Sequence, residues 1–254
     1  MSEEIVVTVE GRVHEIRINR PEKRNALNRA AREGLFAAFR AAQADDTCRA
    51  VIVTGTGDVS FCAGADLVEM SRTGLTVPPK DFTPRLGTNV QLDKPVIAAV
   101  NGAAFAGGFL LAQMADLCVA SENASFAITE AKWGRGAPWA IPLADMIPRR
   151  ALNELLLTAL PVTARRAEVL GLVNDVVPAD RLLPRARELA QAICRNAPLT
   201  IAAHLKMVKL SGEMGRVAAE AVADELFRSV YESRDAQEGP AAFRERREPV
   251  WQGR

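Results

Sequence analysis

Short runs of apolar residues constrain the fold more than any other feature of this sequence. None of them shows the regular alternation of polar and apolar residues that marks a strand with one solvent-facing side. Such runs are typical of strands buried on both faces, as in parallel sheets covered by helices. Because helix-like segments separate the runs, the sequence predicts an α/β fold with a mostly parallel sheet. The runs are AVIVTG (50–55), PVIAAVNG (95–102), DLCVAS (116–121) and GLVNDVV (171–177).

The N-terminal residues predict a different kind of strand pairing. EIVVTV (4–9) and RVHEIRIN (12–19) alternate apolar and polar residues on either side of Gly11, a pattern typical of an antiparallel hairpin. A helix should follow from Leu27, because apolar residues then recur at three- and four-residue spacing, with Asn28 as a candidate N-cap.

The rest of the chain supplies a loop and a helical region. Residues 71–86 contain Gly74 and three prolines and are predicted to form a loop. From about residue 181 the pattern is helical, with Val222, Leu226 and Val230 on one face. No low-complexity linker interrupts the 254 residues, so a single α/β domain is expected.

Charge and hydropathy argue against nucleic-acid and membrane partners. The 32 basic and 31 acidic residues leave a formal charge of +1, so no global field favours nucleic acid or an anionic membrane. No apolar stretch reaches the roughly 18 residues that a membrane span requires. The N-terminus MSEEIVVTVE resembles neither a secretory signal nor a transit peptide, which predicts a cytoplasmic protein.

Metal, disulfide and dinucleotide sites are not predicted. The cysteines are far apart and form no C-x-x-C pair, so they are expected to be free thiols, and both histidines are expected to be structural. GTGDVS (55–60) lacks the third glycine of a dinucleotide-binding turn. The cysteines are Cys48, Cys62, Cys118 and Cys194, and the histidines are His14 and His204.

Two turns rich in glycine and alanine stand out as candidate chemistry. CAGAD (62–66) and NGAAFAGG (101–108) each follow a buried strand. Where such a turn leads into a helix, its backbone N–H groups lack partners and can point at a bound oxygen. Donors placed around an oxygen that gains charge in a transition state contribute about 3–4 kcal/mol each. The alternative interpretation is close packing of helix on sheet, and either turn taken alone fits it.

Six motifs in order make the chain resemble the enoyl-CoA hydratase/isomerase, or crotonase, family. The resemblance implies a crotonase-like α/β spiral of ββα units with a helical C-terminal region. It also implies an enzyme that binds acyl-CoA thioesters and stabilises their enolate between two backbone N–H groups, which by position belong to Ala65 and Gly107. The motifs are NRPEKRNALN (19–28), FCAGADL (61–67), KPVIAAVNGAAFAGG (94–108), SFAITEAKWG (125–134), ARRAEVLGLVNDVVP (164–178) and EGPAAFRERREPVW (238–251).

The same resemblance places the coenzyme. It implies a core domain over residues 1–180 and a helical region over 181–254 that serves oligomerisation and closure of the CoA pocket. Members of the family assemble as trimers paired into hexamers, so a homotrimer or homohexamer is expected, and a monomer in sedimentation would contradict this. No metal or separate cofactor is implied, since the CoA thioester is the substrate. The residues that match the CoA pocket are Arg24, Ala26, Ala63, Asp66, Leu67, Phe243 and Arg246.

Phe243 and Arg246 match positions that often close over the nucleotide from a neighbouring subunit. An ordinary solvated helix end is the alternative interpretation of the RERR run in this tail.

One substitution within the family pattern indicates the reaction. Hydratases of the family use two glutamates, at positions that correspond to 110 and 130, but this sequence has Leu110 and Glu130. AGGFL (106–110) and APW (137–139) resemble monofunctional Δ3,Δ2-enoyl-CoA isomerases, in which a single glutamate moves the proton. Glu130 is therefore predicted to be the only acid/base. The apolar wall expected to raise its pKa by desolvation consists of Phe126, Ile128, Trp133 and Trp139.

Two alternatives stay open at this point. The chain is a hydratase or another crotonase-type lyase if a substitute acid such as Glu69 or Asp145 takes the missing role. It is a non-catalytic acyl-CoA-binding member if Glu130 is incidental. Arg135, within KWGRGAPWAIP (132–142), matches no activity, and a cyclic or branched acyl group is one candidate to stack on the tryptophans there.

Overall fold

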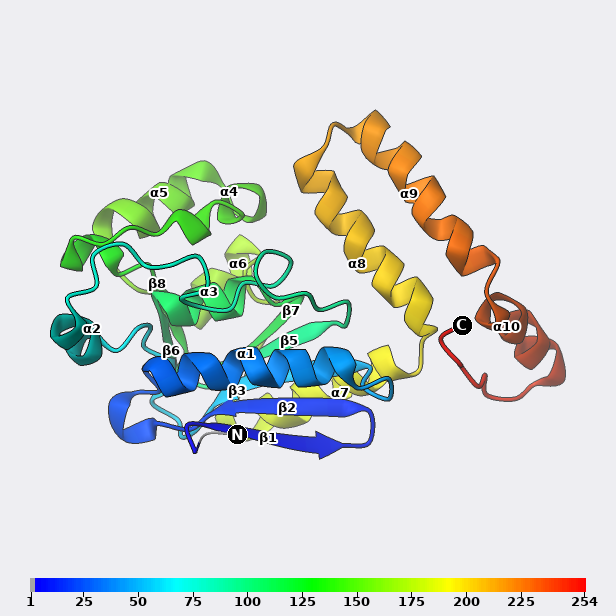
Figure 1. The fold of residues 1–254 in the computed structure, drawn as a ribbon, viewed down its shortest axis with the longest axis horizontal. Coiled ribbons are helices and arrows are strands. Elements are labelled where there is room, and N and C mark those ends of the chain that lie inside the picture. The colour runs from blue at the N-terminus through cyan, green and yellow to red at the C-terminus, as the bar shows by residue number, and fades with distance from the viewer. Residues whose placement is uncertain (1–2) are drawn as a thin grey trace.

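The computed structural model describes residues 3–254, so Met1 and Ser2 of the N-terminal segment considered above lie outside it. A six-stranded sheet forms the base of the molecule, with the order β1-β2-β3-β5-β7-β10 (Figure 1). The first pair is antiparallel and all the others are parallel, as predicted. The strands are β1 (Ile5–Glu10), β2 (Val13–Ile18), β3 (Ala50–Gly55), β5 (Val96–Val100), β7 (Leu117–Ser121) and β10 (Asp175–Val177).

The helices pack on both faces of this sheet. Val51 and Val53 of β3 join a core that includes residues of α1, whereas Ile52 of the same strand joins a second core with Leu182 and Ala186 of α7. This two-sided burial explains why the run 50–55 carries no polar alternation. The helices are α1 (Arg29–Ala44), α2 (Leu67–Thr73), α3 (Gly107–Gln113), α4 (Leu143–Met146), α5 (Arg149–Thr158), α6 (Ala164–Leu170), α7 (Leu182–Cys194), α8 (Pro198–Glu213), α9 (Arg216–Tyr231) and α10 (Arg234–Glu245).

The structure confirms the predicted helix start and corrects two boundaries. The Asn28 side chain accepts a hydrogen bond from the Ala31 N–H at 2.8 Å and so caps α1. The predicted strand over 171–177 is wrong in its first half, because Gly171 ends α6 at φ +85° and only the last three residues pair with β7. The predicted loop over 71–86 begins late, because α2 continues to Thr73 before Gly74 ends it.

A second, four-stranded sheet positions the site. Its order is β4-β6-β8-β9, and β4, β6 and β8 run parallel. The carboxyl ends of these three strands therefore lie side by side. They lead directly into the two small-residue turns and into Glu130. The strands are β4 (Ser60–Cys62), β6 (Ala103–Phe105), β8 (Ser125–Ala127) and β9 (Val162–Thr163), and the short 3-10 turns are Pro21–Lys23, Glu130–Trp133, Pro138–Ala140 and Ala179–Arg181.

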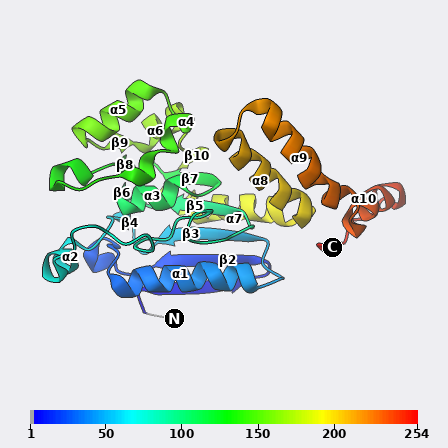
Figure 2. The same cartoon turned by 45° about the horizontal axis from the view of Figure 1, so that its top comes forward.

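The C-terminal helices divide into two parts. α7 lies against the large sheet, whereas α8 and α9 form an antiparallel pair that leans away from both sheets. α10 follows α9 on the side that faces away from the sheets (Figures 1 and 2). The domain division at residue 180 stays a prediction. Among residues 3–254, no helix is both long enough and apolar enough to cross a membrane.

Candidate active site

Two backbone N–H groups from distant parts of the chain lie next to each other. A Cβ built on Gly107 would lie 3.8 Å from the backbone nitrogen of Ala65, so the two turns are in contact. Gly107 is the first residue of α3, where an N–H has no partner within the helix. Within residues 3–254, neither the Ala65 nor the Gly107 N–H donates a hydrogen bond to a protein acceptor. The structure thus brings the predicted pair of donors together.

The backbone at Ala106 is held in an unusual conformation. Its φ is 50° and its ψ is −119°, and its N–H donates to the Ala127 carbonyl at 2.9 Å. A residue with a side chain in such a region costs about 1–3 kcal/mol, a strain that clusters at functional sites. The bend turns the chain from β6 into α3 and fixes the direction of the Gly107 N–H.

Close packing, the alternative interpretation of the turns, also holds for some of their glycines. A Cβ on Gly108 would lie 1.9 Å from the Cys62 carbonyl oxygen. Gly64 has φ +93°, and its Cβ would lie 2.8 Å from that of Ala106. Only glycine fits at these two positions. The same two turns thus serve both purposes: Gly64 and Gly108 allow close packing, and Ala65 and Gly107 present the N–H donors.

Glu130 is the first residue of the 3-10 turn that follows β8, and it is half-buried. Its Oε1 accepts a hydrogen bond from the Trp139 indole Nε1–H at 3.0 Å. Its Oε2 is buried and has no hydrogen-bond partner among residues 3–254. Burial raises the pKa of this carboxyl, and the indole hydrogen bond opposes the increase. A carboxyl with one free, desolvated oxygen suits a group that takes up and returns a proton.

A cavity of about 460 Å³ contains all of these groups. Both N–H donors and Glu130 line it, and so does Leu110, which is only 5% exposed. A leucine at this place can neither donate a proton nor form a hydrogen bond. Among the described residues, Glu130 is the only carboxylate in the cavity wall.

The predicted apolar wall around Glu130 is partly wrong. Trp133 and Trp139 line the cavity, although Trp133 is 61% exposed. Phe126 of β8 and Ile128, which follows β8, are instead buried in the hydrophobic core. Phe126 contacts the cavity wall only indirectly, because its ring packs against Phe109, whose ring packs against Trp139.

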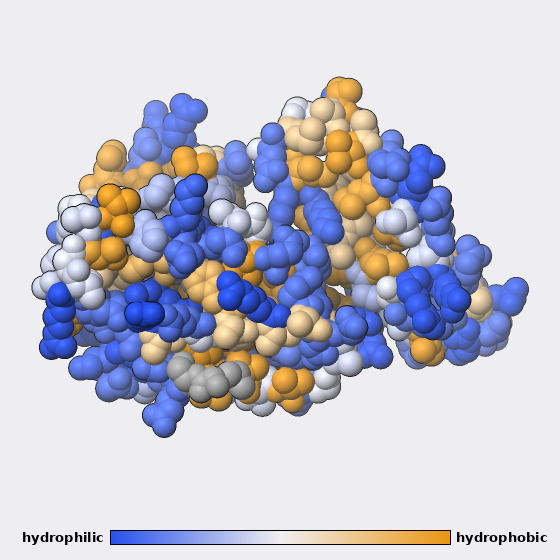
Figure 3. All heavy atoms as spheres, viewed as in Figure 1, coloured by the Kyte–Doolittle hydropathy of each residue, from blue (hydrophilic) through white to orange (hydrophobic). Residues whose placement is uncertain are grey.

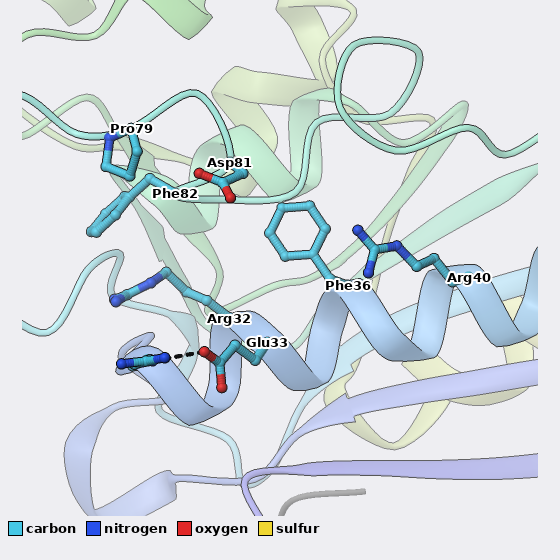
Figure 4. Close-up of a pocket in the computed structure, with 8 residues that line it drawn as sticks. Arg32, Glu33, Phe36, Arg40, Pro79, Asp81 and Phe82 are labelled. Atoms are coloured by element: carbon cyan, nitrogen blue, oxygen red, sulfur yellow. Dashed lines mark hydrogen bonds and ion pairs between the residues drawn. The ribbon is translucent and has the colours of Figure 1, made fainter.

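A loop that includes Pro79 and Phe82 separates this cavity from a second one on the flank of α1. Both residues line both cavities. Arg32 of α1 lies under the Phe82 ring, 4.1 Å from its centroid (Figure 4). The same guanidinium pairs with Glu69 at 2.9 Å. Glu69 is therefore engaged outside the cavity that contains Glu130. Asp145 does not line that cavity either, so neither proposed substitute acid is in place in this structure.

Five of the residues predicted to bind CoA gather at one edge of the cavity. The Ala63 N–H donates to the Arg24 carbonyl at 3.1 Å, and Ala63 and Leu67 line the cavity. The Ala26 carbonyl accepts a hydrogen bond from the Arg20 guanidinium. The same guanidinium pairs with Asp66 at 3.2 Å.

The side chains of Asp66 and Asn25 hold this edge together. Asp66 also accepts hydrogen bonds from the N–H groups of Val68 and Glu69, so it caps α2. Asn25 is fully buried and donates to the carbonyls of Thr56 and Ser60. Sequence reasoning missed the role of Asn25, and its position inside the NRPEKRNALN motif was the available signal.

Phe243 and Arg246 are not brought to the cavity within one chain. They belong to the far end of α10 and its C-cap, and Phe243 is 87% exposed. Their predicted contact with the nucleotide therefore stays a prediction about a neighbouring subunit.

The histidines and cysteines do not line this cavity. His14 lies in β2 and contacts Asp45 at 2.8 Å. The cysteines form no disulfide in the described chain, and burial raises the pKa of the Cys62 thiol to about 12, which leaves it unreactive. Among residues 3–254, no three His, Cys, Asp or Glu side chains gather in a way that could hold a metal ion.

Comparison with known proteins agrees with this geometry. The family model described as enoyl-CoA hydratase/isomerase matches residues 8–254. Carnitinyl-CoA dehydratase from Salmonella agona is 40% identical, with both chains covered in full.

Two crystal structures are similar over the full length of both chains. An enoyl-CoA hydratase from Mycobacterium tuberculosis H37Rv superposes with a TM-score of 0.92 at 37% identity. A probable enoyl-CoA hydratase/isomerase from Mycobacterium abscessus has a TM-score of 0.89 at 39% identity. The fold, the paired donors and the full-length matches show that this chain belongs to the enoyl-CoA hydratase/isomerase, or crotonase, family.

Proposed function

We propose that this protein is a Δ3,Δ2-enoyl-CoA isomerase in which Glu130 is the only acid/base. The observation that carries the proposal is the composition of the cavity. Two unpaired N–H donors and one carboxyl of raised pKa face it, while a leucine occupies the place of a second acid. A single proton carrier suffices for isomerisation, whereas hydration in the family's usual manner needs two.

The proposed reaction moves one proton and one double bond. The thioester oxygen accepts hydrogen bonds from the Ala65 and Gly107 N–H groups. The Glu130 carboxylate removes a proton from C2, and the electron pair of that C–H bond forms the dienolate, whose charge the two donors stabilise. Glu130 then returns the proton to C4. The C3=C4 double bond is lost, C2=C3 forms, and the carboxylate is regenerated.

A paired assay tests the proposal. We expect the purified protein to convert trans-3-hexenoyl-CoA to the conjugated 2-enoyl thioester, without change of mass. We expect crotonyl-CoA to gain water much more slowly, because among the residues that the structure describes only one carboxyl faces the cavity. Rapid hydration of crotonyl-CoA, or rapid dehydration of carnitinyl-CoA as the relatives' name suggests for them, would replace the isomerase proposal by a lyase.

Trp139 is proposed to position Glu130 and tune its pKa. Because its indole N–H stabilises the carboxylate, Trp139→Phe should raise the pKa of Glu130 further above the ordinary 4.5. The base must be ionised, so the acidic limb of the kcat/KM profile should move to higher pH. The measurement is that profile from pH 5 to 9. Trp133→Phe is the control, since Trp133 lines the same cavity but makes no bond to Glu130 in the described chain. An unmoved limb in Trp139→Phe contradicts this role.

The α8–α9 arm supports the proposal of a homotrimer or homohexamer. Apolar atoms gather over this arm at the surface (Figure 3). A monomer rarely exposes a contiguous apolar patch without a partner for it. A neighbouring copy that packs against this arm would bring its own α10 close to this chain. We propose that Phe243 and Arg246 reach the CoA of a neighbouring copy in this way. The exposed apolar residues of the arm include Met207, Val208, Met214, Val217, Val222 and Tyr231.

A further inference from the structure

Arg135 has a half-satisfied guanidinium in the wall of the acyl cavity. Its Nη1 donates to the Leu75 carbonyl at 3.2 Å, which ties it to the loop after α2. Its Nη2 is buried and has no hydrogen-bond partner among residues 3–254. Buried polar groups are normally paired, and a charged donor left without a partner is especially costly. The free Nη2 therefore marks a place where a ligand atom is expected.

The charge of the cavity indicates what kind of atom that is. The charged residues of its wall are Arg85, Arg135 and Glu130, so two guanidinium groups face one carboxyl. Such a cavity favours an anionic acyl group and disfavours a cationic one.

Arg135 does not serve Glu130 itself. The two residues share a turn, since the Arg135 N–H donates to the Glu130 carbonyl at 3.0 Å, but no ion pair joins their side chains in the described structure. The charge of Arg135 is thus available to a part of the ligand away from the reacting carbons.

The position of Arg135 in the cavity indicates which part of the ligand it contacts. Arg135 lies between the turns that carry Glu130 and Trp139, whereas the residues predicted to bind CoA lie at the starts of α1 and α2. We propose that Arg135 binds a carboxylate at the far end of the acyl chain. The substrate class is then a CoA monothioester of an unsaturated dicarboxylic acid, held by a charge-assisted hydrogen bond. This rests on the proposed isomerase reaction for the position of the double bond.

Binding of two saturated thioesters tests the carboxylate site without any reaction. Adipyl-CoA and hexanoyl-CoA have acyl chains of equal length and differ by the terminal carboxylate, and neither can be isomerised or hydrated. We expect isothermal titration calorimetry to show adipyl-CoA binding about 10-fold tighter. Arg135→Met should reduce this ratio to about one, and Arg135→Lys should retain part of it. Lys132→Met, which removes an exposed charge from the same turn, should leave the ratio as in the wild type.

The outcomes separate this proposal from the isomerase proposal. Equal affinities in the wild-type protein, or a loss in Arg135→Met that is the same for both thioesters, overturn the carboxylate site and point to a role in holding the loop or the CoA. Circular dichroism and the unfolding temperature check that each variant is folded. A preference for adipyl-CoA that depends on Arg135, found in a protein without isomerase activity, would keep the site and reject the reaction.

Discussion

Replacement of Glu130 by glutamine should lower kcat for the 3-enoyl thioester by about 10²–10⁴-fold, the usual contribution of a positioned acid–base group. Glutamine keeps the shape and can still accept the indole hydrogen bond of Trp139, but it cannot take up a proton. The measurement is single-turnover formation of the conjugated thioester. Asp145→Asn is the matched control, since Asp145 does not line the cavity and should retain wild-type turnover.

Other outcomes of this experiment decide among the alternatives. Unchanged turnover in Glu130→Gln would remove Glu130 from the mechanism. Absence of turnover in both the wild type and the variant, with binding of acyl-CoA intact, would favour the non-catalytic acyl-CoA-binding protein. Loss of activity in Asp145→Asn would instead support a lyase with a second acid.

The same variant should be more stable than the wild type at neutral pH. Burial raises the pKa of Glu130 in the folded state above the 4.5 of an ordinary glutamate, so the folded protein holds the proton more tightly than the unfolded chain does. Glu130 therefore makes the free energy of unfolding fall as pH rises from 4.5 through the folded-state pKa. Glutamine has no such dependence. The unfolding temperatures of the wild type and Glu130→Gln should be similar at pH 4, and at pH 8 the variant should unfold at the higher temperature.

Gly108→Ala should lower the stability of the fold and the activity of the site together. The new Cβ would lie 1.9 Å from the Cys62 carbonyl oxygen, so α3 and the end of β4 must move apart. Overpacking of this kind costs about 1–3 kcal/mol and occasionally more. Because the movement also separates the Gly107 and Ala65 N–H groups, kcat should fall together with stability. Urea unfolding and the 3-enoyl assay measure the two effects.

Gly215→Ala is the control for this substitution. Gly215 is the N-cap of α9 with φ −64°, and a Cβ built there meets no atom within 4 Å. The change should therefore cost no more than the N-cap preference for glycine over alanine, less than about 1 kcal/mol, and should leave kcat as in the wild type. If Gly108→Ala unfolds at the same midpoint concentration of urea as the wild type, the two turns are not packed as tightly as described.

Much of the fold follows from local patterns. The hairpin around Gly11, the cap at Asn28 and the strand over 50–55 were predictable because alternation, capping and two-sided burial act over a few residues. The strand expected from Gly171 fails for a local reason as well. A glycine that ends a helix at positive φ interrupts the apolar run there, and hydrophobicity does not report that conformation.

The sequence by itself determined the residue types that bear the chemistry. Through the resemblance it also determined their roles: small residues at Ala65 and Gly107, a carboxyl at Glu130 and a leucine at 110. Only the tertiary structure decided that these groups share one cavity, because the parallel pairing of β4, β6 and β8 is long-range.

The tertiary structure also decided which side chains face that cavity. β8 turns Phe126 into the core, and within residues 3–254 one nitrogen of Arg135 is left without a partner in the wall of the cavity. The spacing of apolar residues along the chain indicates which residues share a face of a strand or helix. The partner of a buried charge depends on which distant segments fold against it, and that is why Arg135 acquired an interpretation only in the folded protein.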